Sequence, residues 1–239
     1  MLATRAADLP VLEPSHPCFD CKVRSLAVCG VLEAAALRQF KQSGITVHYE
    51  PGETVVFESD VAASVYSLTA GLLRLSKLLP DGRRQIAGFL FPGDFLGITM
   101  EEEHAFTAEA VAPSTLCRFP RARFDEFVVA LPTLESRLYA VAAHELAAAR
   151  QQLVLLGRKT ATERVASFLL MLAGRCAHNV EPDIILPMSR VDIADYLGLR
   201  IETVSREITG LKTSRVIRLT GRQSLQIVDR EQLEQLAEG

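Results

Sequence analysis

The sequence has no apolar run long enough to cross a membrane, and its first 17 residues lack the apolar core of a secretory signal peptide. It also lacks a nucleophile motif and a glycine-rich phosphate loop, so we do not expect an enzyme. These absences predict a cytoplasmic protein that has no membrane partner. The chain has 239 residues, of which 49% are hydrophobic and 23% charged, which is enough for two globular domains.

Five cysteines, an odd number, are present, and Cys18, Cys21 and Cys29 lie within twelve residues. In a reducing compartment such clustering indicates metal or redox chemistry before disulfides. Cys18 and Cys21 can reach one metal centre from a single turn, and Cys29 can return to it after about two turns of helix. The segment supplies no fourth ligand, and thiolates suit zinc as well as an iron–sulfur centre.

The remaining thiols and imidazoles carry weaker signals. Taken alone, Cys117 and Cys176 are each expected to be small buried hydrophobic residues, with an oxidation-sensitive thiol as the alternative for Cys176. His16 lies beside Cys18 and could act as a ligand, whereas the other histidines are dispersed without metal spacing. A thiol oxidoreductase built on Cys18 and Cys21 is disfavoured, because the βαβ context that it needs is absent.

Between about residues 45 and 119, segments rich in β-branched and aromatic residues alternate with turn signals, after a short predicted helix over 32–42. Short strands separated in this way predict an antiparallel β-roll or barrel. The last predicted strand, over 115–119, carries Cys117. The turn signals are Glu50-Pro-Gly52, Thr69-Ala-Gly71, Pro80-Asp-Gly82 and Phe91-Pro-Gly-Asp94.

From about residue 123 to 156 the pattern is helical, and Pro132 divides a short helix from a long one. In the long helix, apolar and small residues recur every three or four positions, as in a coiled-coil seam. An amphipathic helix lying on its own domain is the equal alternative. The seam residues are Tyr139, Ala142, Leu146, Ala149, Leu153 and Leu156.

Residues 189–219 predict two short amphipathic helices joined by a tight turn, which is typical of a helix-turn-helix DNA reader. Ser189 and Asp192 form a capping-box pattern before the first helix, and Gly198 can end it in the left-handed conformation. The second helix, over 201–214, should present a polar face to the major groove. The expected buried residues are Val191, Ile193, Ala194 and Leu197 in the first helix and Ile201, Val204, Ile208 and Leu211 in the second, and the expected polar face is Glu202, Ser205, Arg206 and Thr209.

The surroundings of the second helix strengthen this prediction. From Arg200 to Arg222 there are six Lys or Arg against two Glu, an excess that suits a polyanion. Segments 216–219 and 225–228 predict a β-hairpin, or wing. An ordinary helical hairpin is the alternative for the helix pair alone, but the added wing favours DNA binding.

Three features together resemble the CRP/FNR family of bacterial transcription regulators. They are Pro92-Gly-Asp94-Phe-Leu-Gly97 in the β-rich region, the long helix, and Glu202-Thr-Val-Ser205-Arg206 in the second helix of the pair. The resemblance implies an α+β fold with an N-terminal antiparallel jelly-roll sensory domain of the cyclic-nucleotide-binding kind, a long dimerisation helix and a C-terminal winged helix-turn-helix. The implied divisions are a cysteine-cluster segment (1–30), the β-roll (31–122), the dimerisation helix region (123–157) and the DNA-binding domain (158–239).

Within that family, the same reading edge together with four cysteines resembles the oxygen-sensing FNR branch and its FixK-like and FnrN-like relatives. This resemblance implies a [4Fe–4S] cluster on Cys18, Cys21, Cys29 and Cys117 that oxygen breaks down. The intact cluster would favour a homodimer that binds palindromic DNA with TTGAT-like half-sites, recruits RNA polymerase and controls genes for low-oxygen or anaerobic metabolism.

The resemblance also implies roles for particular residues. The seam over 139–156 would form the dimer interface, and the turn at Asp81, Gly82 and Arg83 would contact polymerase, with a solvated hairpin tip as the equally good alternative. No cyclic nucleotide is expected, because Asp94 and the acidic run 101–103 stand where an anion site would need donors. The implied DNA contacts are Arg200, Glu202, Thr203, Ser205 and Arg206.

Two alternatives remain open. The chain could be a regulator of the same fold that senses a small molecule or thiol oxidation, with its cysteines binding zinc or no metal. It could also be a metal-binding scaffold that does not bind DNA.

Overall fold

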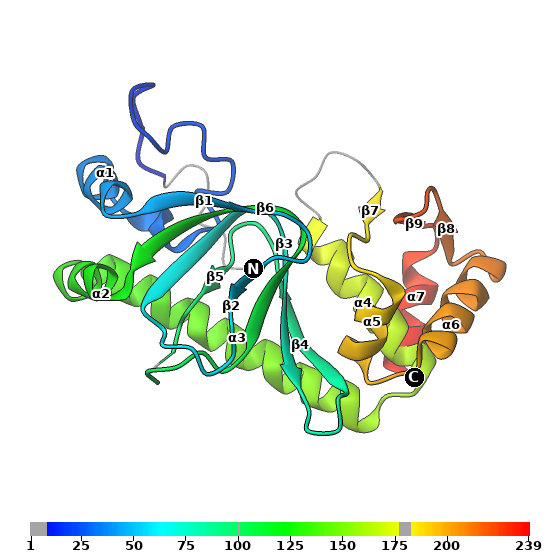
Figure 1. Cartoon of the computed structure of the whole chain (residues 1–239). Helices are drawn as coiled ribbons and strands as arrows, with labels where there is room; N and C mark the ends of the chain where they lie inside the picture. Colours follow the sequence, from blue (N-terminus) through cyan, green and yellow to red (C-terminus); the bar gives the residue numbers. More distant parts are fainter. Residues whose placement is uncertain (1–8, 100, 177–182) are drawn as a thin grey trace. The chain divides into compact units, whose positions relative to one another are not determined.

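The computed structural model describes residues 9–99, 101–176 and 183–239 (Figure 1). The chain divides into two compact units. The first consists of Met1–Lys77 and Ala87–Ala147, and the second of Leu78–Ile86 and Ala148–Gly239. Within the described residues, every helix is too short or too polar to span a lipid bilayer.

The first unit is built on a rolled antiparallel sheet, and this confirms the predicted α+β class with an N-terminal β-roll. The strand order is β1-β6-β3-β4, with β2 paired to β6 and β5 paired to β3 (Figure 1). The two longest strands, β3 and β6, pair along most of their length. The strands are β1 (Ile45–Tyr49), β2 (Thr54–Val56), β3 (Ser64–Leu78), β4 (Arg84–Leu90), β5 (Phe95–Leu96) and β6 (Thr107–Pro120).

One of the predicted turns is wrong. The segment Thr69-Ala-Gly71 does not reverse the chain, because β3 runs through it and pairs with β6 on both sides. The register shifts between Leu68 and Leu72, which marks a β-bulge. Gly71 has a φ of +94°, and a Cβ atom there would collide with the side chain of Ser114. The glycine therefore permits a bulge and a close approach of two strands.

A single hydrophobic cluster joins the N-terminal segment and three helices to the roll. Phe40 of α1 (Ala34–Gln42) stacks on Phe119 of β6 with 4.2 Å between ring centroids. Helix α1 begins two residues later than predicted, because Leu32 is extended and ends a 3-10 turn, η2 (Val28–Val31). The buried members are Leu12, Cys18, Val28, Leu32, Leu37, Phe40, Val65, Phe95, Phe119, Phe124 and Leu134.

The predicted division at Pro132 is confirmed, since α2 (Arg121–Ala130) ends there and α3 (Pro132–Arg158) begins. The start of α3 is anchored by Leu134, which is completely buried in the cluster. Leu138 and Val141 pack against the same cluster. Beyond them the helix is mostly exposed, so only its first three turns contribute to the core of the first unit.

The second unit combines helices with a three-stranded antiparallel sheet of order β7-β9-β8. Helix α4 packs against α6 and α7, and its Val165, Leu169 and Leu172 are completely buried. Strands β8 and β9 form the predicted wing. The elements are α4 (Ala161–Cys176), β7 (Ile184–Ile185), α5 (Arg190–Leu197), α6 (Ile201–Thr213), β8 (Ile217–Leu219), β9 (Ser224–Ile227) and α7 (Arg230–Glu238).

Helix α7 is not predicted from the sequence, because its many Gln and Glu residues resemble a polar tail. It is nevertheless fixed, since Leu233 and Ala237, four residues apart on one face, are buried. Asp229 caps its first turn by accepting from the backbone N–H of Gln232 at 2.9 Å. The sequence signal for this helix is a capping residue, Asp229, followed by apolar residues four positions apart.

Candidate functional site

The first helix of the predicted pair, α5, begins and ends as its sequence indicates. The Ser189 hydroxyl accepts from the Asp192 N–H at 3.1 Å, and the Asp192 carboxylate accepts from the Ser189 N–H at 3.0 Å. This completes the capping box. Gly198 ends the helix with φ of +61°, in the left-handed region. Within the second unit, Arg84 also pairs with Asp192 and Asp195, at 2.8 Å each.

The second helix, α6, is anchored by Val204, Ile208 and Leu211, which are all buried. Two residues predicted to be buried are not: Ile201 is 38% exposed, and Val191 of α5 is 47% exposed. Both lie in the first turn of their helix. The other six residues predicted to be buried in the two helices are buried.

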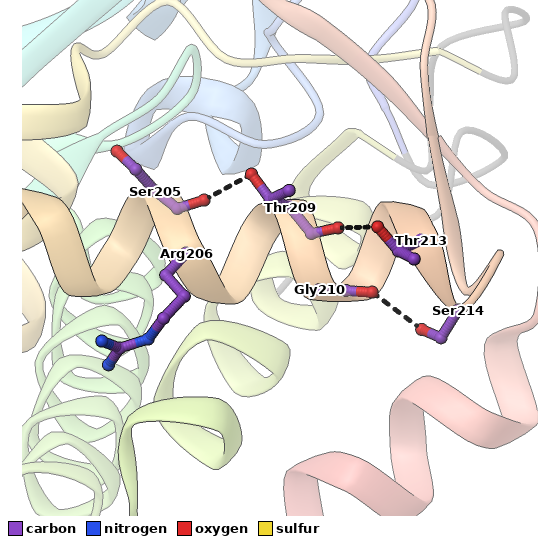
Figure 2. Close-up of a pocket in the computed structure, with 6 residues that line it drawn as sticks. All are labelled: Ser205, Arg206, Thr209, Gly210, Thr213 and Ser214. Atoms are coloured by element: carbon purple, nitrogen blue, oxygen red, sulfur yellow. Dashed lines mark hydrogen bonds between the residues drawn. The ribbon is translucent and has the colours of Figure 1, made fainter.

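The outward face of α6 carries the predicted reading residues. Glu202, Ser205 and Arg206 are exposed, and Thr203 is half-buried. Figure 2 shows Ser205 and Thr209 along one edge of the helix, where the Thr209 hydroxyl donates to the Ser205 carbonyl at 2.8 Å, and Arg206 extending from the other side. The Arg206 guanidinium lies 3.6 Å from the Glu207 carboxylate, but its side chain is 73% exposed and available to a ligand.

Cationic residues border the reading face at both ends. Arg200 occupies the N-cap of α6, where its side chain makes no capping bond and is exposed. At the other end, Lys212, Arg215 and Arg218 line a hollow beside the wing. Their basic character is apparent from the sequence, but their spacing does not assign them to the reading face. Their exposed cations on one border of α6 are suited to phosphate contacts.

A second candidate site is formed by cysteines in the first unit. Cys18, Cys21, Cys29 and Cys117 are free thiols that line one small cavity of about 30 Å³. The first three come from the N-terminal segment, whereas Cys117 lies on β6, opposite Thr46 of β1. The structure therefore brings together the four cysteines that the resemblance implied. The side chain of Cys176 lies outside the described part of the structure.

Burial favours the protonated form of the three N-terminal thiols. It raises the pKa of Cys18 to about 11 and that of Cys29 to about 12, and it also raises the pKa of Cys21. The neighbouring sulfurs add to the effect, because each thiolate would repel the next. A metal bound here would have to displace these protons, so binding would strengthen as pH rises.

The surroundings of the four thiols are cationic. Arg24 and Lys41 line the cavity, and the Lys41 ammonium donates to Cys117 Sγ at 3.1 Å. Arg137 donates to the Leu26 carbonyl at 2.8 Å, but its Nε is buried without a hydrogen-bond partner. Burial lowers the pKa of Arg137, and the charge of Cys29 opposes that shift. Of the residues that line the cavity in the structure, none is a carboxylate.

These residues fit a four-thiolate centre in number, kind and charge, because a set of thiolates would partner the three cations. In the described residues, no group of three or more His, Cys, Asp or Glu side chains is already placed closely enough to hold a metal ion. The space of about 30 Å³ is about that of one water molecule, so a polynuclear centre requires the thiols to separate.

His16 positions the cysteine segment. Its Nδ1 accepts from the Cys18 backbone N–H at 3.0 Å, which leaves Nε2 as the protonated nitrogen facing the Ala34 carbonyl at 3.0 Å. Both ring nitrogens are therefore engaged, and the structure does not support His16 as a metal ligand.

The predicted seam of α3 is largely uncovered. Tyr139, Leu146 and Leu153 are 78%, 53% and 71% exposed, and Ala149 is exposed. Ala142 and Leu156 are half-buried. A helix that leaves large apolar side chains in water has a surface suited to a partner.

The other predicted residues lie in turns and loops. Asp81 accepts from the Arg83 N–H at 3.0 Å and pairs with its guanidinium at 2.7 Å, and Gly82 has a φ of +83°. Asp94 accepts from the Phe91 N–H at 2.9 Å, and residues 101–103 are exposed.

A β-roll, a long helix and a winged helix-turn-helix together define a class of DNA-binding transcription regulators with a separate sensory part. Residues 163–236 match the family described as a Crp-like helix-turn-helix domain, and residues 46–130 match the cyclic nucleotide-binding domain. The chain belongs to the CRP/FNR family of transcription regulators.

Several relatives cover most of the chain. It is 50% identical to the nitrogen fixation regulation protein FixK of Bradyrhizobium diazoefficiens over 84% of this chain and 86% of that protein. It is 37% identical to the transcriptional activator protein FnrL of Cereibacter sphaeroides over 90% and 89%, respectively. The structure of FixK2 from Bradyrhizobium japonicum matches with a TM-score of 0.77 and 37% identity, over 81% of this chain and 96% of that chain.

Proposed function

We propose that this regulator responds to oxygen through a [4Fe–4S] centre held by Cys18, Cys21, Cys29 and Cys117. The observation that carries the proposal is that four cysteines, three from one segment and one from a distant strand, line a single cavity with Arg24 and Lys41. When bound, such a centre supplies an oxygen-labile link between these thiolates. The resemblance to the oxygen-sensing branch favours iron–sulfur over zinc, which four thiolates would also suit.

The chain's own residues would connect this site to α3. The segment that carries Cys18 and Cys29 packs in the same hydrophobic cluster as Leu134, and Arg137 of α3 binds the Leu26 carbonyl. A movement of this segment that separates the thiols would therefore act directly on the first turns of α3. This contact provides a physical route from the thiol site to the dimerisation helix.

The uncovered seam of α3 would form the homodimer interface. Tyr139, Leu146 and Leu153 supply apolar area, but the alanines between them bury little, at about 0.8 kcal/mol per missing methylene. Such a seam is marginal alone and responds to small changes beside it. We propose that cluster assembly favours pairing and that cluster loss disfavours it.

The dimer would bind palindromic promoter DNA with TTGAT-like half-sites. Two α6 helices related by a two-fold axis would enter successive major grooves about 34 Å apart. Glu202, Ser205 and Arg206 are exposed and suited to base edges, because Arg donates to guanine and Glu accepts from cytosine. Arg200 and Thr203 would add contacts at the start of the helix. RNA polymerase is the further proposed partner, with Asp81, Gly82 and Arg83 as its contact.

We further propose that the chain has four functional parts, with boundaries after residues 30, 122 and 157. The genes that it controls would serve low-oxygen or anaerobic metabolism.

The test combines anaerobic spectroscopy with DNA binding. Protein purified without air should contain iron and sulfide, absorb visible light and shift a palindromic DNA fragment, and air should abolish all three properties. Cys29→Ser and Cys117→Ser should lose the absorption and the anaerobic shift. Cys176→Ser is the matched control, because it removes a thiol outside the proposed set. A Cys117→Ser protein that still binds DNA in an oxygen-dependent way would refute the proposal.

A second candidate is favoured by the closed geometry. The small cavity and the raised pKa values of Cys18, Cys21 and Cys29 suit metal-free thiols that stabilise the core while the protein senses another signal. That protein would be colourless, and its DNA binding would not change with air.

A further inference from the structure

Lys41 is held in place from both ends of α1. Before the helix, His16 Nε2 contacts the Ala34 carbonyl at 3.0 Å. After it, Gly44 lies so close to β6 that a Cβ atom there would clash with the carbonyl of Arg118. Helix α1 is therefore fixed to the strand that carries Cys117, and Lys41 lies in its last turn.

The ammonium group of Lys41 sits over a pair of directly opposed residues in the sheet. Its Nζ donates to Thr46 Oγ1 at 2.9 Å and to Cys117 Sγ at 3.1 Å, and these two residues are partners across β1 and β6. Neither acceptor is a carboxylate, so these contacts leave the positive charge uncompensated. Lys41 is half-buried, which weakens screening by water.

Lys41 differs from the other two cations near the thiols. Arg24 lines the cavity, and Arg137 donates a hydrogen bond to the Leu26 carbonyl. Within the described residues, Lys41 is the cation whose hydrogen bond to a cysteine sulfur the structure shows. Hydrogen bonds and charge at ligand sulfurs are among the factors that set the potential of a thiolate-held centre.

We propose that Lys41 is a positioning residue that raises the reduction potential of the four-thiol centre by holding positive charge at Cys117 Sγ. This inference rests on the proposed function. A nearby positive charge stabilises the more electron-rich state, so its removal should lower the midpoint potential. We expect a change of about tenfold in the ratio of the reduced to the oxidised form at a fixed potential, which is about 59 mV for a one-electron couple.

The experiment uses the full-length protein loaded with iron and sulfide without air. Lys41→Met keeps most of the apolar stem and loses the charge, whereas Lys41→Arg keeps the charge. Lys22→Gln is the matched control, because it removes an exposed lysine next to Cys21. The readouts are iron and sulfide content and the midpoint potential from a mediated titration followed by visible absorption.

The expected result is a lower potential for Lys41→Met, with Lys41→Arg and Lys22→Gln close to the wild type. Equal potentials for the wild type and Lys41→Met would overturn the inference. If Lys41→Met fails to load while Lys41→Arg loads, the charge at this position serves to hold the centre and not to tune its potential, and the inference is wrong. If both fail, the lysine acts through its shape, and the inference is wrong. A wild-type protein that never loads would instead defeat the proposed function.

Discussion

The DNA-reading helices are formed by residues close together in the sequence, whereas the thiol cavity is formed by residues far apart in it. The reading helices lie within one short stretch of chain, and their start, turn and buried face are set by neighbours in sequence. The thiol cavity joins residues 18–29 to Cys117, which only the pairing of β6 with β1 and β3 puts in place. A local site can be found from spacing, whereas a distributed site needs the fold.

The difference extends to electrostatics. The reading face exposes Arg206 to water, where its charge is ready for a polyanion. The thiol cavity buries uncharged sulfurs beside cations. The reading face is therefore prepared for its ligand, whereas the cavity must change protonation and volume before it can hold a metal centre.

The largest expected effect is on thiol reactivity, and it tests whether the cavity is closed. Burial raises the pKa of Cys29 from 9.0 to about 12. At pH 8 its thiolate fraction in metal-free protein should therefore be about a thousandfold lower than in the unfolded chain. Iodoacetamide labelling, followed by mass spectrometry, should be slower by about that factor.

The pH profile separates pKa from access. Labelling of the folded protein should continue to rise from pH 9 toward 12, whereas labelling in urea should level off about one pH unit above 9, because the raised pKa delays thiolate formation in the folded protein. Parallel profiles would contradict the predicted burial.

A core truncation in α6 should have the next largest effect and tests whether the local pattern is anchored as described. Ile208→Ala removes a buried side chain and should lower the free energy of unfolding by about 2–5 kcal/mol. Ile201→Ala, in the same helix but 38% exposed, should cost about 1 kcal/mol or less. Urea denaturation followed by circular dichroism gives both values, and equal losses would show that the first turn is packed after all.

Arg206→Ala tests base reading against general attraction. We expect a loss of about 1–3 kcal/mol in discrimination at a guanine position, with little change on unrelated DNA. Lys212→Ala, at the border of the reading face, should weaken binding to all sequences and reduce the salt dependence. Mobility-shift titrations on matched and mutated half-sites measure both, and a uniform loss for Arg206→Ala would make it a phosphate contact.

The smallest effect concerns the capping box. Ser189→Ala removes the hydroxyl that accepts from the Asp192 N–H and should destabilise the second unit by about 1 kcal/mol. Ser205→Ala, on the exposed face of α6, is the control and should leave the melting temperature nearly unchanged. A similar loss for both would indicate that the capping bond contributes nothing specific.

The sequence is sufficient where the signal is local. Ser189, Asp192, Gly198 and Pro132 mark helix boundaries that the structure confirms. It fails where distant strands decide the outcome. The segment that ends at Gly71 has residues typical of a turn. However, β3 continues through it as a bulge, because the strand pairs with β6 on both sides.

The thiol site shows the same limit. Spacing within residues 18–29 indicates metal chemistry, but it cannot supply a fourth ligand. Cys117 alone has the character of an ordinary buried thiol, and only the family resemblance linked it to the other three. Lys41 was not predicted at all, because its contact with Cys117 depends on the docking of α1 beside β6.

The two halves of the cavity differ in how firmly they are attached. Cys117 lies on β6 between its strand partners Thr46 of β1 and Ser67 of β3. A shift of its backbone would therefore break the pairing of β6 with two strands. Cys18, Cys21 and Cys29 stand on turns and a single 3-10 turn outside the sheet. The N-terminal segment is therefore held by side-chain packing in the hydrophobic cluster and not by strand pairing. Replacing it with the corresponding segment of a relative should change the thiol site and leave the sheet and the helix-turn-helix folded.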